Sequence, residues 1–170
     1  MNVFNAKSIA NYFIEQAAAR GETISPMKLQ KLVYYAHGWY AGYTDRPLIN
    51  EAVEAWQYGP VIPSIYHEFK RFGSGCITGK AFEYDALGVR EAAVPSDPDV
   101  RAFLQNVYNS YSKYSGVQLS EMTHAAGTPW DVTWAAAKGM RGVDIPFATI
   151  CEHFKNAVRK VQNGQTAVQA

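Results

Sequence analysis

The sequence predicts a mainly α-helical fold, a compact single-domain helical bundle of about six to seven helices with a small β element. Apolar residues recur at helical spacing through most of the chain, and residue types that favour helix N-caps stand before several of these segments. With 170 residues, 48% of them hydrophobic, the chain is long enough to bury one core without cross-links. We therefore expect one domain over residues 1–161 and a flexible tail over 162–170.

Two helices are expected in the first quarter of the chain. Asn5 can accept hydrogen bonds from the first backbone amides of a helix over about residues 6–19, and Gly21 offers a left-handed stop after it. Ser25 and Pro26 have the residue types of an N-cap and a first helical position, so a second helix is expected to begin there. The apolar stripe of this second helix should face the core and contains Leu29, Leu32, Val33, Ala36 and Tyr40.

Gly38 lies inside the second helix, where glycine costs about 1 kcal/mol relative to alanine. We therefore expect a neighbouring element to approach the helix closely at this residue.

A third helix is expected after Gly59, Pro60 and Pro63, which interrupt the preceding secondary structure. The apolar residues of this third helix are Ile62, Ile65, Tyr66, Phe69 and Phe72.

Two regions are predicted to hold β structure. Residues 51–58 contain β-type residues bounded by turn formers, which favours a short strand. Residues 74–96 are rich in turn formers and are predicted as a loop with one hairpin, whose β structure lies within 81–94.

The second half of the chain contains four expected helices. The first has the clearest apolar periodicity and is expected to end at Gly116, before a short helix over about 117–124. A glycine-rich connection should separate the last two helices. The expected starts are Asp97-Pro98, Val117, Thr128-Pro129 and Pro146.

Composition limits the classes of partner. Sixteen basic and fifteen acidic residues give a formal charge of +1, so binding driven by phosphate neutralisation or by an anionic membrane surface is not favoured. No apolar run approaches the ~18 residues that a membrane span needs. Cys76 and Cys151 are far apart and fit two free thiols in a reducing cytosol. We expect a cytoplasmic protein, and self-association is left open.

Catalytic and metal sites are not favoured by the residue patterns, and no cofactor is predicted. The histidines lack the spacing of metal-binding motifs; they are His37, His67, His124 and His153. Ser120 and His124 would lie one helical turn apart, but the adjacent Glu121 would point about 100° away, so a catalytic relay is not formed locally. A hydrolase using Ser120, His124 or His67 is the least favoured function.

The region from Lys28 to Pro60 is unusually rich in aromatic side chains beside basic ones. Lys28, Lys31 and Tyr35 share a helix face different from the apolar stripe. Aromatic and basic residues together are typical of protein contact sites, although Trp39 and Trp56 fit a core equally well. The predicted partner-binding residues are Lys28, Lys31, Tyr34, Tyr35, Trp39, Trp56, Tyr58, Gly59, Pro60 and His67.

Several segments resemble a known family, the Panacea domain, also described as SocA-like antitoxin or phage-associated protein. The resemblance lies in residues 28–39, 47–48, 54–63, 66–69 and 119–124, with Pro129 and Trp130. Order and spacing match across about residues 5–135, which makes the resemblance far more specific than a single short motif.

This resemblance implies a mainly α-helical domain with a small β element that acts as an antitoxin in a toxin–antitoxin system. The implied partner is a co-encoded protein toxin, neutralised by direct protein–protein binding, and the family offers no catalytic residues to transfer to this chain. The alternative is a phage- or prophage-derived adaptor or regulatory protein that binds a host protein. Residues 74–98 match nothing in the family and are candidates for setting partner choice.

Overall fold

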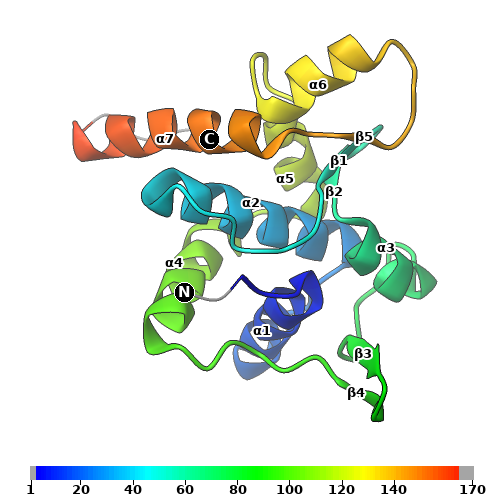
Figure 1. Cartoon of the computed structure of the whole chain (residues 1–170). Coiled ribbons are helices and arrows are strands. Elements are labelled where there is room, and N and C mark those ends of the chain that lie inside the picture. The colour runs from blue at the N-terminus through cyan, green and yellow to red at the C-terminus, as the bar shows by residue number, and fades with distance from the viewer. Residues whose placement is uncertain (1–2, 165–170) are drawn as a thin grey trace.

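Helix α2 (Pro26–Thr44) runs through the middle of the molecule, as the computed structural model shows for the described residues 3–164. Helices α1 (Ala6–Ala19) and α4 (Pro98–Tyr111) lie on one side of it, and α7 (Phe147–Gln162) lies on the other (Figure 1). The expected apolar stripe of α2 is buried, but so is much of the face that carries Lys31 and Tyr35. This helix is therefore covered on nearly all sides, whereas the sequence pattern indicates only one core-facing stripe.

The described residues form seven α-helices, which confirms the mainly α-helical prediction. Helix α3 (Pro63–Phe69) continues into a 3₁₀ turn (Lys70–Phe72), and α6 spans Pro129–Ala137. The side chains of Asn5, Ser25, Asp97 and Thr128 cap their helices as the sequence indicates.

The start of α5 (Gly116–Thr123) differs from the expectation. Gly116 is the first residue of this helix, so its main role is not to end the helix before it. Ser115 Oγ accepts from the Gln118 backbone amide, and Gln118 Oε1 accepts from the Ser115 amide. This reciprocal pair fixes the helix start one residue earlier than the apolar pattern suggests.

A three-stranded antiparallel sheet is formed by β2 (Gly59–Val61), β1 (Glu54–Trp56) and β5 (Val143–Asp144), in that order. The strand expected within 51–58 is present as β1 but is shorter, and β2 and β5 were not expected. Pro60 is tolerated in β2 because this strand lies at a sheet edge, where a missing N–H need not break the ladder.

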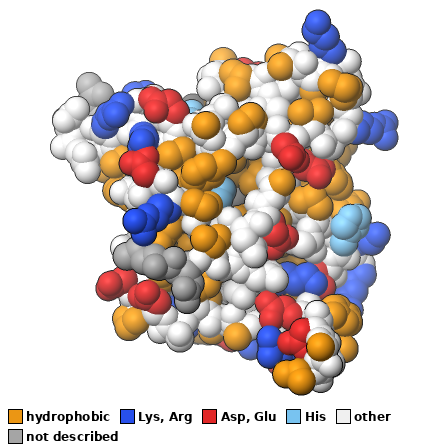
Figure 2. Space-filling model, in the orientation of Figure 1, with side chains coloured by type: hydrophobic (Ala, Val, Ile, Leu, Met, Phe, Trp, Pro, Cys, Tyr) orange, Lys and Arg blue, Asp and Glu red, His pale blue; other side chains and the backbone are white. Residues whose placement is uncertain are grey.

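A second, two-stranded sheet confirms the hairpin expected within 81–94. Strands β3 (Phe82–Asp85) and β4 (Gly88–Glu91) pair in antiparallel register. Figure 2 shows this hairpin projecting at the lower right of the molecule, with hydrophobic side chains among charged ones. The exposed hydrophobic residues here include Tyr84, Leu87 and Val89.

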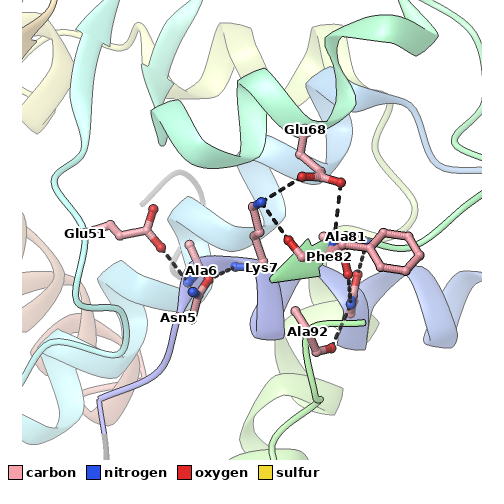
Figure 3. A network of polar contacts seen from close by, with 9 residues as sticks. Asn5, Ala6, Lys7, Glu51, Glu68, Ala81, Phe82 and Ala92 are labelled. Carbon is pink, nitrogen blue, oxygen red and sulfur yellow. Dashed lines mark hydrogen bonds and ion pairs between the residues drawn. The ribbon is translucent and has the colours of Figure 1, made fainter. Parts of the chain in front are cut away.

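Polar side chains of α1 tie the base of the β3–β4 hairpin to the body (Figure 3). Lys7 Nζ donates to Glu68 Oε2 of α3 at 2.7 Å and also to a backbone carbonyl at the start of β3. Asn11 is buried, and its amide exchanges hydrogen bonds with the backbone of Ala81 and with the carbonyl of Ala92. Both ends of the hairpin are thus fixed to one helix.

The remaining sequence expectations concern the chain end and the thiols. Gln162 is the last residue of α7, so the expected tail begins inside a helix, and residues 165–170 lie outside the described part. Cys76 and Cys151 are both free, with Cys151 buried. None of the helices described between residues 3 and 164 is long and apolar enough to cross a membrane.

Candidate functional site

The β1–β2 hairpin is the place where the sequence segments of interest meet. It stands beside α3, α5 and α6 (Figure 1). Trp56 pairs with Gly59 across the turn, and Gln57 and Tyr58 form an exposed tip. Gly59 has φ of 102°, a conformation that favours glycine.

Side chains from three helices bind the carbonyl oxygens of this hairpin. The bonds run from Trp130 Nε1 to Trp56 O at 2.7 Å, from Ser120 Oγ to Tyr58 O at 2.7 Å, and from Lys31 Nζ to Pro60 O at 3.0 Å. The three donors lie on α6, α5 and α2, far from the hairpin in sequence. Edge and turn carbonyls that have no strand partner are satisfied in this way.

The end of the hairpin is held by the buried side chain of Gln30. Gln30 Nε2 donates to Ile62 O, and Gln30 Oε1 accepts from Ile62 N, both at 3.0 Å. Residues 54–62 with their four side-chain donors are called the clamped hairpin below. Its backbone is fixed by bonds to side chains at every second residue from Trp56 to Ile62.

Lys31 is the most unusual of these donors because its side chain is only 2% exposed. Burial lowers the pKa of its ammonium group from 10.5 to about 7. A Cβ atom on Gly59 would lie 2.7 Å from Lys31 Nζ and 2.6 Å from Thr123 Oγ1. Gly59 is therefore required both by its backbone conformation and by the close approach of these two polar atoms.

Four of the predicted contact residues lie away from the hairpin, and their partners are on α4, on α7 or just after α4. The ring of Tyr35 is fully buried and stacks on Tyr111 at 4.3 Å, and Tyr34 is buried beside it. Trp39 is half-buried and donates from Nε1 to the Tyr111 hydroxyl, while Lys28 Nζ donates to the carbonyl of Ser112. These residues have structural partners, and a contact role for them stays a prediction.

The exposed aromatic residues lie at the hairpin tip and on α3. Tyr58 is 63% exposed and Tyr66 is 40% exposed, and His67 is exposed next to Tyr66. The half-buried ring of Trp56 meets Tyr66 edge to face at 4.8 Å. We call Trp56, Tyr58, Tyr66 and His67 the hairpin face.

Tyr66 is the member of the hairpin face that is not among the predicted contact residues, because the sequence pattern groups it with the apolar residues of its helix. Ile65 and Phe69 are the buried residues of α3. A residue that directly follows Ile65 points about 100° away from it on a helix, and this spacing is the signal that would have placed Tyr66 outside.

A cleft of about 890 Å³ opens beside the clamped hairpin. Its walls include the aromatic rings of Trp56, Tyr66 and Trp134, and its lining also includes three basic residues. The basic residues are Lys31, Lys70 and Arg141. A second concavity, of about 1170 Å³, is lined mainly by α4, α5 and the C-terminal half of α2, and contains none of the hairpin residues.

Comparison with known proteins places these features in a family. The family model described as "Antitoxin SocA-like, Panacea domain" matches residues 29–131. The chain belongs to this family. It is also 38% identical over 130 residues to "Antitoxin SocA" of Caulobacter vibrioides (strain NA1000 / CB15N), covering 75% of this chain and 69% of that protein. No solved structure matches the chain at a significant level.

The SocA-like Panacea match supports an antitoxin function and contains the whole clamped hairpin. Its four side-chain donors also fall within residues 29–131: Gln30, Lys31, Ser120 and Trp130. Several of the segments that resemble the family, residues 28–39, 54–63 and 119–124 with Trp130, therefore meet in one local structure.

In this Panacea domain, Ser120 and His124 have separate surroundings. The Ser120 hydroxyl donates to the Tyr58 carbonyl, and the His124 ring packs on Trp130 with ring centres 3.9 Å apart. Burial lowers the pKa of His124. Within residues 3–164, no group of three His, Cys, Asp or Glu residues is arranged to hold a metal ion.

Proposed function

We propose that the chain neutralises a co-encoded protein toxin by binding it directly through the hairpin face. The observation that carries this proposal is the contrast between a backbone fixed at alternate residues and a tip that exposes Tyr58. A contact loop that is already rigid loses less conformational entropy when it binds. The clamped hairpin therefore supports a preformed contact surface.

The residue types of the hairpin face support the same proposal. Tyrosine and tryptophan are enriched among the residues that dominate protein–protein affinity, since each combines a large apolar area with a polar tip. Tyr58 and Tyr66 leave much of their ring area to solvent, and Trp56 braces Tyr66 from the hairpin side. In this proposal Gly59, Pro60 and Lys31 support the surface rather than form its outermost part.

The test is co-expression with the product of the adjacent gene. The double variant Tyr58→Ala, Tyr66→Ala should lose both growth rescue and co-purification of the neighbouring protein. Its melting temperature should shift by only a few degrees, because Tyr58 is largely exposed and Tyr66 is partly exposed. The control is Tyr43→Ala, which removes an exposed tyrosine outside the clamped hairpin and outside residues 74–98 and should retain rescue.

Three outcomes would contradict the proposal. The first is that the neighbouring protein proves harmless when expressed alone. The second is that the hairpin variant rescues growth as well as the wild type does, and the third is that the control variant loses rescue to the same extent as the hairpin variant. Purification from the native cell supplies a further check. Recovery of a host protein in place of the neighbouring gene's product would favour the adaptor alternative.

A further inference from the structure

The cleft beside the clamped hairpin contains a buried lysine with unused hydrogen-bonding capacity. Lys31 lines this cleft, and its Nζ donates to the Pro60 carbonyl at 3.0 Å. A lysine ammonium carries three N–H donors, so one bond to a carbonyl leaves donors free. Among the described residues, no carboxylate forms an ion pair with Lys31, although buried charges in proteins are usually paired.

The other charged residues of the cleft have the same sign as Lys31. Lys70 and Arg141 lie in its lining, and no Asp or Glu residue is found there. The rings of Trp56, Tyr66 and Trp134 make the walls between them largely apolar. A complementary occupant is therefore anionic at one point and apolar on either side of it.

We propose that this cleft receives an acidic side chain of the partner, an aspartate or glutamate flanked by apolar residues, whose carboxylate binds Lys31 Nζ. The identification of that partner as the toxin rests on the proposed function, because the cleft adjoins the hairpin face through Trp56, Tyr58 and Tyr66. Binding completes the hydrogen bonding of the buried ammonium group. It also adds a charge-assisted bond in a site partly shielded from water, where such bonds are strongest.

Gly59 lets the Lys31 amine approach the hairpin backbone closely. Any side chain there would meet Lys31 Nζ at 2.7 Å. This close approach holds Nζ at the Pro60 carbonyl, in a bond that uses one of its hydrogens.

The wild-type chain can be tested with three short peptides that differ only in their carboxylates. Binding of Ac-Phe-Glu-Phe-NH₂, Ac-Phe-Gln-Phe-NH₂ and Ac-Phe-Gln-Phe-OH is followed through the indole N–H signals of Trp56 and Trp134 in NMR titrations. The glutamate peptide should bind about tenfold or more tightly than the glutamine amide. Equal affinities, or no binding by any peptide at millimolar concentration, would overturn the proposal, and a preference for the free C-terminus would assign the cleft to a chain end instead.

A variant pair then assigns the preference to Lys31. Lys31→Met keeps the apolar stem and removes the donor, so the glutamate and glutamine peptides should bind equally. Ser120→Ala removes another bond to the same hairpin but does not line the cleft, so it should retain the preference. If Lys31→Met fails to fold, Lys70→Met and Arg141→Met decide instead: both should retain the preference, and its loss in either would assign the carboxylate to that side chain.

Failure of this inference can be told apart from failure of the proposed function. Loss of toxin binding in the variant Tyr58→Ala, Tyr66→Ala, together with equal peptide affinities on the wild type, would keep the hairpin face and remove the carboxylate site. Retained toxin binding in that variant, together with tighter binding of the glutamate peptide to the wild type, would keep the carboxylate site and remove the hairpin face as the toxin-binding surface.

Discussion

Gly38 of α2 lies so close to the ring of Phe154 of α7 that a Cβ atom on this glycine would be 2.1 Å from Phe154 Cε2. Phe154 is fully buried, and its ring also meets Tyr34 and Tyr35 edge to face. One turn later, a Cβ on Gly42 would lie 2.8 Å from the backbone of Phe154. The central helix and α7 therefore pack through glycines, which confirms the close approach predicted at Gly38.

Gly38→Ala should destabilise the fold by about 1 to 3 kcal/mol, because an added methyl group overpacks the contact with Phe154. This loss should appear in urea unfolding even though alanine gains about 1 kcal/mol in helix propensity. Gly79→Ala is the matched control, since its nearest neighbour would be Arg71 Nη2 at 3.9 Å. Unchanged or increased stability of Gly38→Ala would show that α7 can move away from α2.

Gln30→Leu should cost about 1 to 3 kcal/mol of folding free energy, because the buried N–H of Ile62 would lose its partner and the Ile62 carbonyl would keep only its bond from the Tyr66 amide. The free energy of unfolding from denaturant titration measures this loss. Gln162→Leu, at the exposed end of α7, should change stability by only about 0.5 kcal/mol. Similar values for the two variants would mean that the hairpin does not depend on its Gln30 clamp.

Tyr35 and Tyr58 were both predicted as contact residues, and their burial now separates them. Tyr35→Ala should lower stability by about 3 to 5 kcal/mol, since it empties a fully buried site stacked on Tyr111. Tyr58→Ala should lower it by about 0.5 kcal/mol or less while weakening partner binding. Thermal melts of both variants, with a pull-down of the partner, check this. A stable Tyr35→Ala variant that loses binding would restore Tyr35 as a contact residue.

The helices were predictable because their signals are local. Asn5, Ser25 and Thr128 each bind a backbone amide within three residues, so residue type and position are enough to place a helix start. Local signals also explain why α5 was expected to begin at Val117 and not at Gly116. A glycine is compatible both with the residue that ends one helix and with the first residue of the next.

The burial of the second face of α2 was not predictable, because it depends on elements distant in sequence. Tyr35 is covered partly by Tyr111 of α4, and the residues next to Tyr35 in the sequence do not indicate this partner. The clamped hairpin was hidden for a related reason. Its acceptors are backbone carbonyls, which every residue carries, so no residue pattern shows that Ser120 and Trp130 reach residues 58 and 56.

His37 is a buried titratable group that should make stability depend on pH. It is 3% exposed, its ring lies near Phe147, and its Nδ1 accepts from the Ile49 backbone amide at 3.4 Å. Burial lowers the pKa of His37 from 6.5 to about 4. Between these two values the unfolded chain binds more protons at this site than the folded chain does.

Stability should therefore be fullest above pH 6.5 and should fall as pH drops toward about 4, with His37 accounting for about 3 kcal/mol of the loss. His37→Gln keeps a hydrogen-bond acceptor for Ile49 and removes the titration, so its unfolding free energy should fall less over the same range. His124 and His153 also have lowered pKa values, and their contribution remains in both proteins. Urea titrations at pH 7 and pH 4.5 give the comparison, and parallel losses in the two proteins would mean that His37 titrates as it does in the unfolded chain.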